Sequence, residues 1–228
     1  MTRDADELCL PIVEGALRRR FSIVAVPAVA VIVSVVTVLT RLGAVSLRDL
    51  ASTPQGVADG REWQLLTSAF VADRPAVPSV VGFTIVGLAA LAFAGARILW
   101  TAAIAGHVLA TVIVYAALDV GQVTVSRPDY GTSAIIAAWI GVIACCLWRR
   151  GAAGAAVGLC VVAAVVAWFF RPDLDILDTE HAVALAVGIG VAAWVPRLRA
   201  VQLRVLLPRQ GLLLHAGLLR LGSARRSG

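Results

Sequence analysis

The chain has 228 residues, of which 60% are apolar and only 15% are charged, and its mean hydropathy is +0.89. A soluble domain carries about 25% charged residues to cover its surface, so this composition argues against a soluble globular enzyme. The net charge is +6, every basic residue is Arg, and the chain contains neither Lys nor Asn. The Arg residues flank apolar runs instead of gathering with aromatic residues, so we expect a lipid bilayer, and no nucleic acid, as a partner.

Six apolar runs recur along the chain, each near the length that crosses a bilayer, about 17 to 25 residues. They occupy residues 21–40, 77–96, 98–118, 131–148, 152–170 and 181–195. Arg97 alone separates the second run from the third, which predicts a tight helical hairpin. The pattern predicts an all-α membrane protein with six transmembrane helices, multi-pass in a bacterial plasma membrane. Its parts are an N-terminal segment 1–20, a membrane domain 21–196 and a basic tail 197–228.

The distribution of Arg predicts the orientation of the six helices. With the N-terminus in the cytoplasm, the inner segments hold 14 of the 20 Arg and four of the 14 acidic residues. Cytoplasmic loops carry an excess of positive charge in membrane proteins, and the opposite orientation would reverse this division. We therefore expect both termini to be cytoplasmic.

The connection between the first two runs is long and ends in an amphipathic segment with Trp63, Leu65, Leu66 and Phe70. Such a segment can lie in the membrane interface. Of the polar groups elsewhere, we interpret His107 as a buried packing residue bonded to a neighbouring carbonyl. The acidic residues between the fifth and sixth runs are interpreted as a solvated loop: Asp173, Asp175, Asp178 and Glu180.

Polar residues within membrane helices are candidates for function because their burial is costly. Ser133 stands at the outer end of the fourth run and His181 at the outer end of the sixth, each 16 residues before an Arg at the inner end. At a rise of about 1.5 Å per residue, both lie about 24 Å above that Arg. The two side chains therefore share one depth, on helices that run in the same direction.

Small residues follow both candidates at helical spacing. Ala137 and Gly141 follow Ser133, and Ala184 and Gly188 follow His181. Small residues on one face let two membrane helices pack closely, and a serine hydroxyl must come within about 2.6–3.2 Å of an imidazole to be activated by it. We therefore predict a helix seam directly below the Ser133–His181 pair.

These motifs resemble those of the rhomboid intramembrane serine proteases. Gly131-Thr132-Ser133-Ala134 is similar to the Gly-x-Ser-x nucleophile motif on the family's fourth helix, and His181 with its small residues is similar to the sixth-helix motif. The segment 62–67 looks like the family's Trp-Arg-x-x-Thr segment, with Gln64 in place of Arg. The resemblance spans residues 21–196 and implies a six-helix bundle.

The resemblance also implies a function. Ser133 would be the nucleophile and His181 its base, cleaving membrane-anchored or transmembrane protein substrates without a metal or a cofactor. Oxyanion or substrate contacts are expected from Gly131 and Thr132 before the serine. The second run lacks the His and Asn that active family members carry there, and Ser79, Thr84 and Gln64 are the candidates in their place.

Other interpretations remain open. The missing Asn favours a catalytically inactive rhomboid-fold protein that binds transmembrane helices. A small transporter is a third possibility, although no run has paired charges or a centre broken by Gly or Pro. Taken alone, the Gly-x-Ser-x motif is typical of a helix cap and His181 of an interfacial histidine. The sequence indicates neither the substrate nor the oligomeric state.

Overall fold

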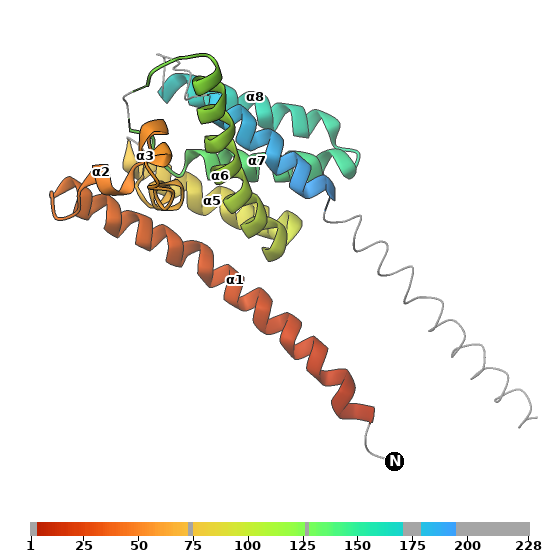
Figure 1. The fold of residues 1–228 in the computed structure, drawn as a ribbon. Coiled ribbons are helices and arrows are strands. Elements are labelled where there is room, and N and C mark those ends of the chain that lie inside the picture. The colour runs from red at the N-terminus through yellow and green to blue at the C-terminus, as the bar shows by residue number, and fades with distance from the viewer. Residues whose placement is uncertain (1–3, 73–74, 126–127, 171–178, 195–228) are drawn as a thin grey trace, which may run out of the picture. The chain divides into compact units, whose positions relative to one another are not determined.

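The computed structural model describes residues 4–72, 75–125, 128–170 and 179–194. Within these ranges the regular structure is helical, apart from one isolated antiparallel bridge between Ser52 and Asp129 (Figure 1). The chain divides into two compact units, Met1–Ala192 and Ala193–Gly228, and the packing described below belongs to the first. The predicted basic tail 197–228 lies outside the described residues.

Each of the six predicted apolar runs coincides over most of its length with one long helix of the described residues. The long helices are α1 (Asp4–Arg41), α5 (Ala76–Ala94), α6 (Ala96–Val120), α7 (Ser133–Arg149), α8 (Ala153–Phe170) and a last helix, Thr179–Trp194. The connection after α1 contains α2 (Leu47–Leu50), α3 (Pro54–Ala58), α4 (Gln64–Thr67) and the 3₁₀ turn η1 (Ser68–Phe70). The helix α1 begins at Asp4, well before the predicted start at residue 21. Between α5 and α6 the chain turns at Gly95, whose φ of 83° favours glycine.

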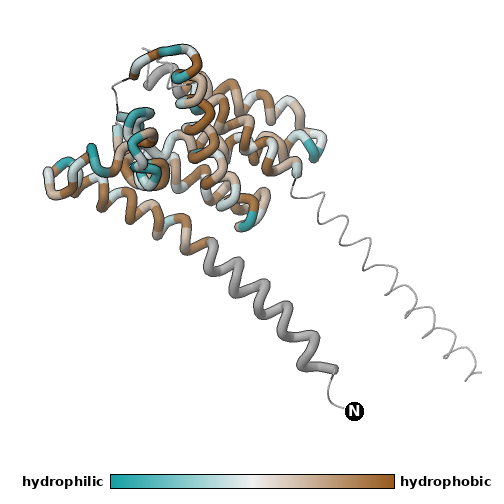
Figure 2. The backbone as a smooth tube through the Cα atoms, viewed as in Figure 1, coloured by the Kyte–Doolittle hydropathy of each residue, from teal (hydrophilic) through white to brown (hydrophobic). Residues whose placement is uncertain are grey.

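The long helices have the composition and the surface of membrane helices. Ile23–Arg41, Ala76–Ala94 and Ala96–Val120 are long and apolar enough to cross a membrane, and α7, Ala153–Val166 and Thr179–Trp194 are apolar but shorter. Large apolar side chains face outward, among them Val24 at 65% exposure and Val77 at 74%. Hydrophilic residues gather in the α2–α4 connection and at the helix ends (Figure 2). The described part of the chain thus matches an all-α membrane protein.

Helix α7 packs against α5, α6 and α8 and carries the largest buried side chain, Trp139. The Trp139 ring lies 4.7 Å from the Phe83 ring and 6.4 Å from the Trp100 ring, centroid to centroid. Its Nε1 donates a hydrogen bond of 3.0 Å to the Leu99 carbonyl. A Cβ at Gly87 would lie only 2.7 Å from the Trp139 ring, so glycine makes room for it. This contact fixes α7 against both α5 and α6.

The loop before α7 is held by the long first connection. Ser52 and Asp129 exchange two backbone hydrogen bonds, of 2.9 and 2.8 Å. The Ser52 hydroxyl lies 2.8 Å from the Tyr115 hydroxyl of α6, within hydrogen-bonding distance. Two residues later, the Gly131 N–H donates to the Ser68 carbonyl at 3.1 Å. Polar groups from three parts of the chain therefore fix the entry into α7.

The amphipathic segment around α4 and η1 turns its apolar side outward. Trp63 is 55% exposed, Leu66 53% and Phe70 36%, whereas the polar residues Gln64 and Ser68 are each 1% exposed. A segment in water would show the opposite pattern. An outward apolar side next to long apolar helices is the arrangement that contact with lipid favours.

Candidate functional site

Ser133 is the first residue of α7, directly after a turn that requires glycine. Gly131 has a φ of 140°, which side-chain-bearing residues rarely adopt. Thr132 is the N-cap residue, is fully buried, and makes no side-chain cap hydrogen bond. Ser133 itself is partly buried. Because the first N–H groups of a helix have no acceptor within that helix, the start of α7 can donate hydrogen bonds to a negatively charged oxygen placed beside Ser133.

The backbones of α7 and the last helix touch at two glycines. A Cβ at Gly188 would overlap the carbonyl group of Ala138, and a Cβ at Gly141 would overlap the carbonyl oxygen of Leu185. In both cases the obstacle is backbone, which cannot move aside as a flexible side chain can. The two helices therefore approach as closely as small-residue membrane helices do.

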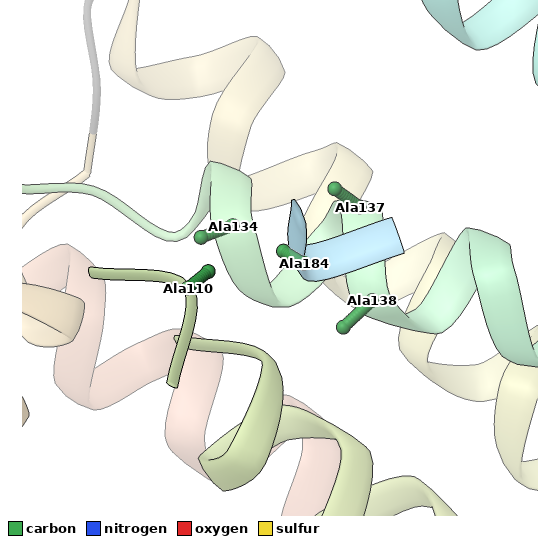
Figure 3. Close-up of a cluster of buried hydrophobic side chains, with 5 residues drawn as sticks. All are labelled: Ala110, Ala134, Ala137, Ala138 and Ala184. Carbon is green, nitrogen blue, oxygen red and sulfur yellow. The ribbon is translucent and has the colours of Figure 1, made fainter. Parts of the chain in front are cut away.

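Alanines pack between the helices on the N-terminal side of these glycines. A buried cluster contains Ala134, Ala137 and Ala138 of α7, Ala184 of the last helix and Ala110 of α6. Figure 3 shows Ala184 among the three α7 alanines. A third helix thus joins the seam, and Gly106 of α6 meets Ala138 so closely that a Cβ there would overlap the Ala138 side chain. The predicted small residues at Ala137, Gly141, Ala184 and Gly188 all lie at this contact.

The register of the seam places Ser133 level with the start of the last helix. The pairs Ala138–Gly188 and Gly141–Leu185 are separated by 50 and 44 residues in sequence, a mean of 47. Near the other end, Arg149 Nη1 donates to the Ala192 carbonyl at 3.2 Å, so the two helices run in the same direction. An offset of 47 residues pairs Ser133 with residue 180. His181, partly buried, is one residue further along.

Helix α5 borders Ser133 on another side. A Cβ at Gly82 would lie 3.8 Å from the Ile136 side chain of α7. Ser79, one turn before Gly82, is on the same face of α5 and level with Ser133, and its hydroxyl donates to the Pro75 carbonyl at 3.1 Å. Thr84 is about 200° around the helix from Gly82 and donates to the Val80 carbonyl at 2.9 Å. Of the two candidate donors on α5, Ser79 shares the face towards α7.

Glu180 is buried, with an exposed fraction of 5%, so its interpretation as part of a solvated loop is wrong. Its Oε1 accepts a short hydrogen bond from the Thr111 hydroxyl and lies 4.0 Å from His107 Nδ1. The other three acidic residues of the predicted loop, Asp173, Asp175 and Asp178, lie outside the described residues. A carboxylate is costly to bury without partners, and α6 supplies two of them.

His107 is buried, as expected, and bridges two elements. Its Nε2 lies 3.1 Å from the hydroxyl of Ser68, while its Nδ1 faces Glu180. The 4.0 Å between Nδ1 and the carboxylate is longer than a hydrogen bond, and the tautomer of the ring decides whether Nε2 donates to the Ser68 hydroxyl or accepts from it. We call the four residues Ser68, His107, Thr111 and Glu180 the Glu180 network. Our sequence analysis missed this network, although His107 and Thr111, four residues apart on an apolar helix, are a signal for one.

Among the residues that the structure describes, no group of three or more His, Cys, Asp or Glu side chains could hold a metal ion. The described cysteines Cys145, Cys146 and Cys160 are free thiols. No protein-family model matches the chain, and no curated protein matches it either. What the site can do therefore has to be inferred from its own residues: a serine at the start of α7, a histidine near the start of the last helix, and a buried carboxylate one residue before that histidine.

Proposed function

We propose that this protein is an intramembrane serine protease of the rhomboid type, with Ser133 as the nucleophile and His181 as its general base. Its substrates would be transmembrane or membrane-anchored proteins. We further propose six membrane crossings, with both termini in the cytoplasm of a bacterium. The observation that carries the proposal is the parallel, backbone-to-backbone contact between α7 and the last helix, because extending its register along both helices supports a position for His181 near the level of Ser133.

The proposed chemistry uses the start of α7. Neutral His181 removes the hydroxyl proton of Ser133, and the serine oxygen attacks a substrate carbonyl. The N–H groups at the beginning of α7 stabilise the negatively charged oxygen that forms. The protonated imidazole then gives its proton to the leaving amine. In the second half of the reaction His181 takes a proton from water, which attacks the acyl-enzyme, and returns that proton to the Ser133 oxygen as it leaves. Ser79 is the side chain of α5 best placed to add a donor, since it shares the level of Ser133.

Covalent labelling tests the proposal. In the purified full-length protein, we expect a fluorophosphonate reporter to modify Ser133, as identified by mass spectrometry of the labelled peptide. Replacing His181 by Ala removes the base, so labelling should become about 10³-fold slower or more. Ser133→Ala should abolish labelling altogether. Ser34→Ala is a matched control, because Ser34 lies on α1 and its hydroxyl donates only to the Ala30 carbonyl of the same helix.

Two results would contradict a serine protease: no labelling of a folded wild-type sample, or labelling that persists at full rate in His181→Ala. The first result would favour the second candidate, a catalytically inactive rhomboid-fold protein that binds transmembrane helices. This candidate is favoured by the composition of α5 and of the whole chain. The chain has no Asn, and the α5 face towards α7 carries Phe83, packed on Trp139, one turn after Ser79.

The proposed topology makes a prediction of its own. In a variant without the native cysteines, single Cys residues would replace Thr124 in the α6–α7 connection and Arg150 after α7, both of which are exposed. A membrane-impermeant maleimide added to intact spheroplasts should label position 124 at once. Position 150 should be labelled only after the membrane is permeabilised. The reverse pattern would exclude cytoplasmic termini.

A further inference from the structure

The Glu180 network joins the two chain segments that carry Ser133 and His181. At one end, the Ser68 carbonyl accepts the Gly131 N–H at 3.1 Å, two residues before Ser133. At the other end, Glu180 is the residue before His181. Between them, the Ser68 hydroxyl contacts His107, and His107 faces the Glu180 carboxylate. Polar contacts thus connect Gly131, two residues before Ser133, to Glu180 at the start of the last helix, and the step from His107 to Glu180 is an approach of 4.0 Å, longer than a hydrogen bond.

Every member of this chain of contacts is buried. The exposed fractions are 1% for Ser68, 4% for His107, 0% for Thr111 and 5% for Glu180. A hydrogen bond in such surroundings is stronger than in water, and a partner left alone is costly. The seam below consists mainly of alanines and glycines, with Val183 and Leu185 packed against it, and these apolar side chains make no hydrogen bonds that would fix a direction. The Glu180 network adds hydrogen bonds, which depend on orientation, at the start of the last helix.

We propose that the Glu180 network positions the Ser133–His181 pair. It does so by preventing the first turn of the last helix from rotating about its own axis and from sliding along the start of α7. This inference rests on the proposed function for its catalytic consequence. Glu180, His107, Thr111 and Ser68 are positioning residues, because they act through the backbone segments beside Ser133 and His181. A displacement of about 1 Å between a nucleophile and its base can cost about 10²-fold in rate.

Labelling kinetics measure the catalytic consequence. Glu180→Gln keeps the size of the side chain and an oxygen acceptor for Thr111 but removes the charge facing His107. Thr111→Val keeps the shape and removes the hydroxyl, which contacts both the Glu180 carboxylate and the His107 carbonyl. For both variants we expect the maximal rate of fluorophosphonate labelling to fall about ten- to hundredfold. The reagent concentration at half-maximal rate and the final extent of labelling should not change.

A matched control separates positioning from simple loss of stability. Thr37→Val is the same substitution as Thr111→Val at another buried threonine, 4% exposed, whose hydroxyl accepts the Ala72 N–H and donates to the Val33 carbonyl. We expect Thr37→Val to lower the melting temperature as Thr111→Val does but to leave the labelling rate unchanged. A network that only stabilises the fold would lower the final extent of labelling in both variants, at an unchanged rate, and would overturn the proposal.

Cysteine cross-linking measures the geometry directly and does not depend on activity. In a chain without the native cysteines, the pair Ser133→Cys and His181→Cys reports on the upper end of the seam. The pair Arg149→Cys and Ala192→Cys reports on the lower end, where Arg149 and Ala192 are in contact. We expect Glu180→Gln or Thr111→Val to slow oxidation of the upper pair at least severalfold and to leave the lower pair unchanged.

The two measurements have separate outcomes. If wild-type protein is not labelled but the upper pair responds to the variants, the protease proposal is wrong and the positioning of the two helices stands. If wild-type Ser133 is labelled but neither variant changes the upper pair or the rate, the protease proposal stands and the positioning role is excluded. Equal loss of cross-linking at both ends would also exclude it, since the network would then hold the whole seam.

Discussion

Replacing Gly188 by Ala should separate the last helix from α7. The added Cβ meets the Ala138 carbonyl carbon and oxygen, so one of the two backbones has to move. Overpacking of a tight contact costs about 1–3 kcal/mol and occasionally more, and we expect the upper end of this range because no side chain can turn aside. The loss should be visible as a lower midpoint of unfolding in detergent, and labelling of Ser133 should fall about 10²-fold as the helices part.

Gly190 offers a matched control two residues further along the same helix. Nothing lies within 4 Å of a Cβ at Gly190, and the residue is exposed. Because Ala is a better helix former than Gly, Gly190→Ala should leave stability unchanged or raise it by up to about 1 kcal/mol. If Gly188→Ala and Gly190→Ala behaved alike, the close contact between the two backbones would be ruled out.

The second large effect is expected at Trp139. Truncation to Ala removes the ring that packs on Phe83 and Trp100 and the hydrogen bond to the Leu99 carbonyl. Replacing a buried aromatic residue by Ala costs about 3–5 kcal/mol, and Gly87, which leaves space for this ring, has no side chain to fill the cavity. Thermal or denaturant unfolding of the purified protein measures this cost.

Trp148 is the corresponding control on the same helix. It is 62% exposed, so Trp148→Ala should change the free energy of unfolding by about 0.5 kcal/mol at most. A similar loss for both tryptophans would mean that α7 is not enclosed by α5 and α6 at Trp139.

Much of this arrangement can be read from local sequence. Each predicted run became a helix because an apolar stretch of this length has one favourable backbone conformation away from water. The seam at Gly141 and Gly188 could also be anticipated, since small residues at spacings of three and four form one face. Counting residues to the Arg at the end of each run predicts a common depth for Ser133 and His181, and this stays a prediction.

The buried network could not be read in the same way. Glu180 follows three acidic residues, and composition alone makes such a stretch look solvated. Its partner Thr111 is 69 residues away, and the contact between Ser68 and His107 spans 39 residues. Whether a carboxylate is buried depends on which groups, distant in sequence, pack against it. The spacing of apolar residues in the sequence carries no information about such contacts. The early start of α1 at Asp4 was not anticipated either, since Pro11, a residue that disfavours a helix interior, lies within the added stretch.

The seam between α7 and the last helix also has a consequence for biosynthesis, because its two helices are synthesised at different times. Chains emerge from the ribosome with the N-terminus first, so α7 and its serine are complete while the residues after 178 are still being synthesised. During that interval Ala138 and Gly141 lack their contacts with the last helix, and His181 has not yet been added to the chain. Under the proposed mechanism, Ser133 would therefore become reactive only after the last helix has been synthesised and has packed against α7.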